Sequence, residues 1–226
     1  MNRVAICRRI EHTGVVPVVR ARNTEQAWLA CRALCAGGVD VLEVTMTVPD
    51  APNLIRELVA QLGSEILVGA GTVLDAETAR ACIRAGAQFI VSPGFDPDIV
   101  RAAHEADKPA LPGALTPTEI MAAMRADADI IKLFPASALG GAKYLRSLRA
   151  PFASARFLPT GGVNATTARD FIAAGAVALG AGSELIDPQA LARGDGGPIT
   201  DRARELVAAV RLAREELATG ASQTQR

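Results

Sequence analysis

The chain alternates short apolar runs with longer helical patterns at a nearly constant interval. From residue 15 onward the apolar runs return roughly every 20 to 28 residues, which is the rhythm of repeated strand–helix units. No run of alternating polarity indicates an antiparallel hairpin, and no linker rich in Pro, Gly and Ser divides the chain before residue 187. The eight runs are VVPVVRA (15–21), VDVLEVTMT (39–47), EILVGAG (65–71), QFIVSP (88–93), PALPGA (109–114), IIKLFPA (130–136), ARFLPTGG (155–162) and AVALGAGS (176–183).

Eight strands, each followed by a helix, predict a single α/β domain over residues 1–226 with the (β/α)8 TIM-barrel fold. The hydrophobic fraction is 50% with only 4% aromatic residues, so the core must be aliphatic, as in buried parallel sheets. A doubly wound sheet is the alternative, but it seldom needs eight strands of this regularity. Outside the strand–helix units we expect an N-terminal helix over residues 1–14, a loop over 187–198, a last helix over about 199–217 and a frayed tail over 218–226.

Capping residues indicate where the helices begin and end. Polar side chains that can accept from free N–H groups stand before several helical patterns, and glycines follow others. The predicted N-caps are Asn23, Asp96, Thr116 and Asn164, and the predicted ends lie at Gly37 and Gly38, Gly63, Gly86 and Gly175.

Charge and composition exclude several classes of partner. The formal net charge is zero, so the chain has no field that would attract nucleic acid or an anionic membrane. No stretch of 18 apolar residues is present, and the N-terminus MNRVAICRRIEHTG is too polar for the apolar region of a signal peptide. We therefore expect a cytoplasmic protein whose partner is a small molecule.

The metal-ligating residue types are sparse. Cys31 and Cys35 lie one helical turn apart, a spacing that could hold a metal, but small buried thiols are the simpler interpretation. His12 and His104 have no other potential ligand near them in the sequence. We expect no metal and no other cofactor.

Lys132 stands out inside the apolar run IIKLFPA. The chain has only three lysines against 21 arginines, so arginine is its ordinary positive charge. Unlike arginine, a desolvated lysine can lose its proton and act as a nucleophilic amine. The alternative is a lysine at a strand end whose ammonium group extends to solvent.

Polar residues at the C-terminal ends of barrel strands are expected to form one site. These are Arg20 on strand one, Glu43, Thr45 and Thr47 on strand two, Thr72 on strand three, Ser92 and Pro93 on strand four, and Lys132 on strand six. Because side chains alternate along a strand, Glu43 and the two threonines share the inner face, while Leu42, Val44 and Met46 face the helices. A carboxylate inside a barrel is costly unless it is paired or catalytic, so Glu43 is a candidate acid or base. The alternative role is that of a structural partner for Arg20 or Lys132.

Two glycine-rich segments follow the last two strands, PTGGVN (159–164) and GAGSEL (180–185). Glycine lets backbone N–H groups approach an anion closely, and barrels often bind a phosphate after strands seven and eight. We expect the helix that follows the first segment to add the positive end of its dipole. The candidate phosphate-binding residues are Thr160, Gly161, Gly162, Gly182 and Ser183.

LEVTMT, VGAGTV, FIVSPGF, IIKLFPA and LPTGGVN, in this order, resemble the class I aldolases that cleave 2-keto-3-deoxy-6-phosphogluconate (KDPG) and 4-hydroxy-2-oxoglutarate (KHG). The resemblance covers about residues 5 to 215. It implies a TIM barrel, usually a homotrimer, with no metal, acting in the Entner–Doudoroff pathway. It also implies a Schiff base on Lys132, proton transfer by Glu43, substrate contacts at Thr72, Pro93 and Phe134, and a phosphate site at Gly161, Gly162 and Ser183.

Thr47 departs from the family pattern, because the well-known phosphogluconate enzymes have arginine at this place. A missing arginine removes a bidentate carboxylate clamp. We expect Arg20, with Thr47 and Thr72, to bind the substrate carboxylate instead. The departure leaves open whether the preferred substrate is the gluconate-derived, the galactonate-derived or an unphosphorylated keto acid.

Two other functions remain as alternatives to the aldolase. A metal-dependent sugar-phosphate epimerase would need histidines at the strand ends, and the chain lacks them. A non-catalytic barrel that binds a sugar phosphate would not need a lysine and a glutamate directed into its interior.

Overall fold

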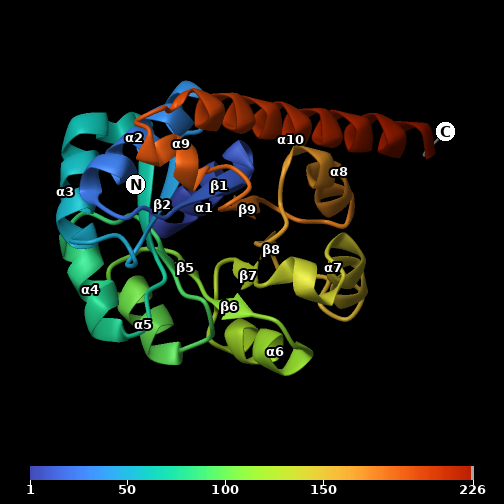
Figure 1. The fold of residues 1–226 in the computed structure, drawn as a ribbon. Coiled ribbons are helices and arrows are strands. Elements are labelled where there is room, and N and C mark those ends of the chain that lie inside the picture. The colour runs from blue at the N-terminus through green and yellow to red at the C-terminus, as the bar shows by residue number, and fades with distance from the viewer. Residues whose placement is uncertain (225–226) are drawn as a thin grey trace.

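Parallel strands alternate with helices along the whole described part of the chain, which in this computed structural model is residues 1–224 (Figure 1). The strands are β1 (Val15–Val19), β2 (Val41–Thr45), β3 (Leu67–Gly71), β4 (Ile90–Val91), β5 (Ala110–Leu111), β6 (Gly113–Ala114), β7 (Ile131–Leu133), β8 (Phe157–Pro159) and β9 (Leu179–Ala181). The helices are α1 (Arg3–Thr13), α2 (Thr24–Ala36), α3 (Ala51–Leu62), α4 (Ala76–Arg84), α5 (Pro97–Glu105), α6 (Pro117–Arg125), α7 (Ala142–Arg149), α8 (Ala165–Ala173), α9 (Pro188–Ala192) and α10 (Gly197–Thr224). Two 3-10 turns, η1 (Gly63–Glu65) and η2 (Ala136–Leu139), complete the order.

The strands form two parallel sheets, of order β5-β4-β3-β2-β1-β9 and β6-β7-β8. Pro112 alone separates β5 from β6, so the fifth expected strand, PALPGA, is split in two. A proline has no N–H to give to a strand ladder, which explains the break. Isolated parallel bridges, Phe157 with Ala176 and Thr160 with Gly180, connect the end of the smaller sheet to the β9 segment. The expected parallel α/β architecture is therefore present as a curled arrangement of these two sheets.

Two apolar layers hold the sheets in place. In one layer, side chains of the strands pack against the surrounding helices, and it includes Leu42 and Val44, as predicted. The other is an inner core, in which Ile6 and Ile10 of α1 pack with strand residues such as Val41 and Leu158. Val41, Glu43 and Thr45 alternate onto one face of β2, so that face is apolar where the strand begins and polar where it ends. The inner core thus fills the N-terminal end and leaves the C-terminal end for polar groups.

The predicted N-caps are confirmed. Asn23 accepts from the Gln26 N–H, Asp96 from Asp98 and Asn164 from Thr166 and Thr167, while Thr116 forms a capping box with Glu119. The first N–H groups of any helix have no partner within the helix, and in a short helix they are a large share of the total. Three of the helices with confirmed caps are short, so the capping side chains matter most for these.

Two segments near the C-terminus differ from expectation. The segment 187–198 is not entirely a loop, because Asp187 caps a short helix, α9, that has Pro188 at its first position. The last helix, α10, is longer than the expected 199–217 and runs from Gly197 to Thr224, crossing the molecule past α8 (Figure 1). The frayed tail expected over 218–226 stays a prediction, and residues 225–226 lie outside the described part of the chain.

Arg214 fastens α10 to the beginning of the fold. Its guanidinium donates to the carbonyl oxygens of Glu11 (2.6 Å), His12 (2.8 Å) and Val177 (3.0 Å). These carbonyls belong to α1 and to the residues just before β9. One side chain therefore joins the first helix, the last strand and the last helix.

A second polar cluster surrounds Asp129, whose side chain is only 6% exposed. Its carboxylate accepts from the Ala110 N–H (2.9 Å), from His104 Nε2 (2.9 Å) and from Arg3 Nε (2.9 Å). These contacts connect the residue that precedes β7 to β5, α5 and α1. Because β7 carries Lys132, the cluster helps to fix the strand on which the candidate site is built.

Asp129→Asn will lower the free energy of unfolding by about 3 kcal/mol, because its amide leaves buried donors without a matching acceptor. Asp127→Asn is the matched control, since Asp127 also pairs with Arg3 (2.6 Å) but is 79% exposed. An exposed ion pair contributes less than about 1 kcal/mol. Urea unfolding curves of the two variants measure the difference, and equal midpoints would contradict the structural role given to Asp129.

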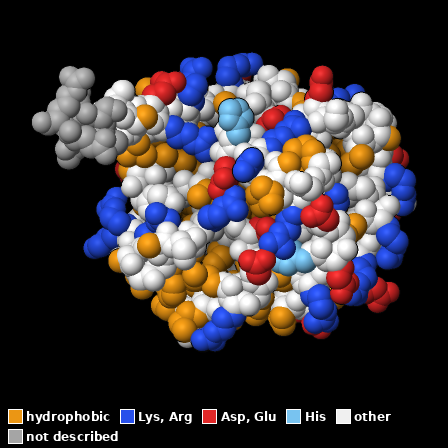
Figure 2. Space-filling view, turned by 180° about the vertical axis from the view of Figure 1, so that it is seen from behind, with side chains coloured by type: hydrophobic (Ala, Val, Ile, Leu, Met, Phe, Trp, Pro, Cys, Tyr) orange, Lys and Arg blue, Asp and Glu red, His pale blue; other side chains and the backbone are white. Residues whose placement is uncertain are grey.

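The outer surface carries charges of both signs. On the face shown in Figure 2, basic and acidic side chains are interspersed and no large patch of one sign forms. This agrees with the zero net charge of the sequence. Within residues 1–224, no helix combines the length and the hydropathy that crossing a bilayer requires.

Candidate active site

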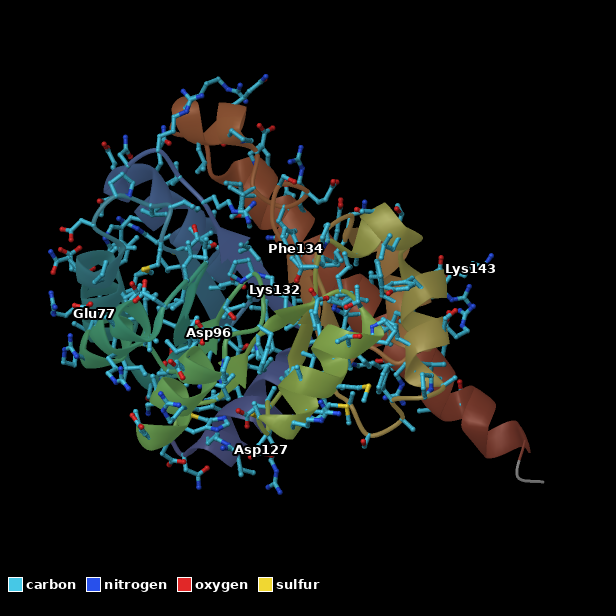
Figure 3. All side chains as sticks on the ribbon, turned by 90° about the horizontal axis from the view of Figure 1, so that it is seen from below. Glu77, Asp96, Asp127, Lys132, Phe134 and Lys143 are labelled. Atoms are coloured by element: carbon cyan, nitrogen blue, oxygen red, sulfur yellow. The ribbon has the colours of Figure 1, made fainter. Side chains whose placement is uncertain are left out.

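Lys132 and Glu43 form a buried ion pair inside the fold. Lys132 Nζ lies 3.4 Å from Glu43 Oε1, and the two side chains are 5% and 1% exposed. The residues come from β7 and β2, so the fold joins segments that are 89 positions apart in the sequence. The Phe134 ring lies 5.5 Å from Nζ, and Figure 3 shows Lys132 and Phe134 near the middle of the molecule, whereas Lys143 lies at its edge.

The position of Lys132 follows from strand alternation. Ile130 belongs to the inner core, and Lys132, two residues later, faces the same side one layer higher. In the ladder it pairs with Gly113 of β6 and Leu158 of β8, neither of which carries a charge. The amine therefore sits in a weakly solvated environment beside a single carboxylate. A lysine amine held beside a carboxylate that can take its proton can act as a nucleophile.

The Glu43 carboxylate occupies space that a glycine leaves open. A Cβ added at Gly71 on the neighbouring strand β3 would collide with Glu43 Oε1. Glu43 Oε2 is buried and has no hydrogen-bond partner among the described residues. Leaving a buried carboxylate oxygen without a partner is costly, which suits a catalytic group. Because no side chain or backbone group of the described part of the chain occupies this oxygen, it is free to exchange a proton with a bound molecule. Sequence reasoning overlooked Gly71, although the expected adjacency of strands two and three pointed to it.

Hydroxyl groups continue the polar face above this pair. Thr45, fully buried, donates to the Val19 carbonyl oxygen (2.9 Å), and its oxygen lies 2.6 Å from that of Thr47, which is exposed. Thr72 is half-buried and has a left-handed backbone with φ of 56°. That conformation is rare and strained for a β-branched residue, and such strain clusters at functional sites. Pro93 is half-buried beside Ser92, whose hydroxyl donates to the Gly94 carbonyl oxygen (2.6 Å).

The glycine-rich segments line a small cavity of about 110 Å³ beside Phe134. Arg20 is the one cationic side chain among its lining residues. Gly161 and Gly162 have φ of 102° and 70°, conformations that glycine adopts without strain. The cavity brings together every candidate phosphate-binding residue: Thr160, Gly161, Gly162, Gly182 and Ser183.

The helix after the first glycine segment is less available to an anion than we expected. The Asn164 side chain already accepts from the N–H groups of Thr166 and Thr167, in the first turn of α8. A phosphate in this cavity would therefore depend on the glycine backbone and on Arg20. Larger hollows, of about 250, 460, 510 and 530 Å³, lie elsewhere and include none of the predicted site residues.

The cysteines are free thiols, and their burial agrees with a structural role. Burial raises the pKa of Cys7 to about 12 and that of Cys82 to about 11. Burial also raises the pKa of Cys31, and Cys35, which is half-buried, reaches about 11. Thiols with raised pKa values are poor nucleophiles and poor metal ligands at neutral pH.

The chain is similar to known aldolases over most of its length. The family model described as "KDPG and KHG aldolase" matches residues 6–202. The KHG/KDPG aldolase of Escherichia coli K12 is 41% identical over 198 residues, covering 88% of this chain and 92% of the relative. The 2-dehydro-3-deoxy-phosphogluconate aldolase of Dickeya dadantii is 42% identical over 194 residues, covering 86% and 91%.

Solved structures agree. The KDPG aldolase of Legionella pneumophila, with pyruvate captured as a covalent carbinolamine intermediate, superposes with a TM-score of 0.79 at 30% identity, covering 85% of this chain and 93% of that one. The native KDPGal structure gives 0.82 at 30% identity, covering 89% and 96%. Family model, sequence relatives and structures thus agree with the motif resemblance: this chain belongs to the KDPG and KHG aldolase family.

Proposed function

We infer that the protein is a Schiff-base aldolase that cleaves KDPG to pyruvate and glyceraldehyde 3-phosphate. The observation that carries this is the buried pair of Lys132 and Glu43, 3.4 Å apart, with one carboxylate oxygen unpartnered. A nucleophilic amine beside a proton-transferring group is the minimum that imine chemistry requires.

The mechanism begins with attack of the Lys132 amine on the C2 ketone of the substrate. The resulting carbinolamine loses water, with a proton supplied by Glu43, and becomes a protonated imine. Glu43 then takes the proton of the C4 hydroxyl, and the electrons of the C3–C4 bond move into the imine. Glyceraldehyde 3-phosphate leaves as the aldehyde. Protonation of the enamine at C3 and hydrolysis release pyruvate and restore the amine.

Phe134 and Pro93 bound the space around the reacting carbons in this proposal. Phe134 adjoins both Lys132 and the glycine-lined cavity, because its ring lies 5.5 Å from Nζ and the residue also lines that cavity. A substrate bound to Lys132 can therefore extend past Phe134 toward the glycines. The phosphate is bound there by Gly161, Gly162, Ser183 and their neighbours Thr160 and Gly182.

Arg20 changes its role relative to the sequence-based expectation. We assigned it to the substrate carboxylate, but it lines the cavity of the candidate phosphate-binding residues. A guanidinium matches the geometry of phosphate oxygens and binds them in a bidentate manner. We therefore propose that Arg20 binds the phosphate end, and that neutral donors, Thr72 among them, bind the carboxylate.

We further propose a closed (β/α)8 barrel that assembles as a homotrimer in the cytoplasm and binds neither nucleic acid nor membrane. The two bridges between the β8 and β9 segments, and the single residue between β5 and β6, support closure. The trimer is supported by family membership alone. A sedimentation measurement of the purified protein tests it directly.

The substrate is tested by pyruvate release from a panel containing KDPG, its galactonate-derived epimer KDPGal and KHG, all in the presence of EDTA. We expect KDPG to be turned over fastest and EDTA to have no effect, because the imine supplies the electron sink that a metal would otherwise provide. KDPGal is the second candidate, since a structure of that name matches well and Thr47 replaces the usual arginine. Activity abolished by EDTA and restored by a divalent ion would contradict the mechanism.

Ser183→Asp will raise KM for KDPG by about 10-fold or more, because a carboxylate would face the phosphate. Arg20→Ala will act in the same direction, since a lost charge-assisted hydrogen bond costs roughly 1.5 to 3 kcal/mol. Both variants will leave KM for unphosphorylated KHG much less affected. Steady-state kinetics with the two substrates measure the contrast, and equal penalties on both would remove the phosphate assignment.

A further inference from the structure

The strand ends opposite the glycine-lined cavity contain no cation. The segments after β2, β3, β4 and β6 are 46–50, 72–75, 92–96 and 115–116, and none of them includes Lys or Arg. They do include hydroxyl groups, and those hydroxyls differ in what they can offer to a bound molecule. A hydroxyl has one hydrogen to donate, so a hydroxyl that already donates to the protein can only accept from a ligand.

The single hydrogen of Thr45 is committed. Its oxygen lies 2.9 Å from the Val19 carbonyl oxygen, which can only accept. Thr45 is fully buried, so its hydrogen can go only to Val19 or to Thr47. Donation to Val19 is the arrangement that satisfies both contacts, because Thr47 can itself donate whereas the carbonyl cannot. Thr45 therefore donates to Val19 and has only its lone pairs left for other partners.

The hydroxyl of Thr47 is consequently oriented as well. The two threonine oxygens are 2.6 Å apart, a distance at which one of them must donate to the other. Since the Thr45 hydrogen already goes to Val19, Thr47 is the donor. Only lone pairs of Thr47 then remain for the strand-end region.

The remaining hydroxyls of these segments differ in whether they already donate their hydrogen to the protein. Ser92 donates to the Gly94 carbonyl oxygen (2.6 Å), and Thr116 donates to Glu119 Oε2 (2.9 Å). Thr72 has no side-chain hydrogen bond among the described residues, and it is half-buried at the end of β3. Of these hydroxyls, that of Thr72 alone keeps a hydrogen to donate.

We propose that Thr47 presents a hydrogen-bond acceptor to the substrate, and so binds a hydroxyl of the fragment that leaves as the aldehyde rather than the carboxylate. A carboxylate offers only lone pairs, and two acceptors facing each other repel. Thr72 donates to the carboxylate. This inference rests on the proposed aldolase function, and it makes Thr47 a selector for hydroxylated substrates rather than a substitute for the arginine found in relatives.

The first test separates the two halves of the substrate. Exchange of the pyruvate methyl hydrogens in D2O reports on the carboxylate-bearing half alone. We expect Thr72→Val to raise KM for pyruvate by about 10-fold and Thr47→Val by less than about 2-fold. With KDPG, Thr47→Val will lower kcat/KM by about 2- to 10-fold, and Thr47→Ser will restore it. Equal increases in KM for pyruvate from the two valine variants would overturn the proposal.

The second test reads the hydroxyl orientation without any reaction. Neutron diffraction of the D2O-exchanged protein will locate the deuterium of Thr45 toward Val19 and that of Thr47 toward Thr45. A Thr47 deuterium directed away from Thr45 refutes the acceptor assignment, even if the enzyme is an aldolase. The two hydroxyls could instead be oriented as proposed while the wild-type protein fails to exchange the methyl hydrogens of pyruvate. That result would remove the proposed aldolase function and with it the substrate role of Thr47.

Discussion

Borohydride reduction in the presence of pyruvate will attach the ligand to Lys132 and inactivate the protein. The reason is that an imine, once reduced, becomes a stable secondary amine on the lysine that formed it. Lys132→Arg will have no measurable aldolase activity, because a guanidinium keeps the positive charge but cannot supply a neutral amine. Peptide mass analysis after reduction identifies the modified residue.

Lys143 supplies the matched control for this experiment. It is an exposed lysine on α7, at the edge of the molecule in Figure 3, away from the labelled Lys132. Lys143→Arg should retain activity and still accept the adduct at Lys132. An adduct on Lys108 or Lys143, or no adduct at all, would refute the assignment of the nucleophile.

Glu43→Gln will lower kcat by about 10²- to 10⁴-fold and change KM far less, which is the usual result of removing general acid–base catalysis. Glutamine keeps the shape of the side chain and one acceptor oxygen, but its NH2 group cannot take up or release the proton. Steady-state kinetics with KDPG measure the two parameters, and thermal unfolding verifies that the variant is folded. Slow trapping of pyruvate at Lys132 should persist, since the amine is still present.

The alternative role of Glu43, as a structural partner of Lys132, makes a different prediction. A structural carboxylate would affect stability, and kcat of the folded fraction would fall only a few-fold. Gly71→Ala adds independent information, because its Cβ would push against Glu43 Oε1 without changing either reacting group. A large loss of kcat in Gly71→Ala, at nearly unchanged KM, supports the catalytic role.

Much of the fold could be predicted because it depends on local patterns. Strand runs and N-caps such as Asn23 and Thr116 are short-range signals, and both were correct. The segment 187–198 was misjudged because its glycines obscured a helix that Asp187 and Pro188 begin. The break at Pro112 could not be predicted from the sequence, because the effect of its missing N–H depends on which strands lie beside it in the sheet.

The candidate site could be proposed from the sequence residue by residue, but the contacts among its side chains could not. Lys132 and Glu43 could be selected from the sequence, because the expected barrel topology brings the C-terminal ends of the strands together. Sequence could not place Arg20 with the glycine-lined cavity, since a long side chain at a strand end can turn either way. Nor could it show that the Thr45 hydroxyl contacts both the Val19 carbonyl of the adjacent strand and the Thr47 hydroxyl.

The pairing of β1 with β9 imposes a delay while the chain is being made. One edge of β1 has no partner until synthesis has advanced from Val19 to Leu179. At roughly 5 to 20 residues per second, that interval is on the order of ten seconds. An apolar strand with an open edge can pair with neighbouring nascent chains. Pro17 does not close this edge, because its backbone points to the same side of the strand as that of Val19, whose carbonyl oxygen accepts from Thr45 of β2. The β9 edge of β1 therefore stays open to such pairing on the ribosome until the last strand of its own chain arrives.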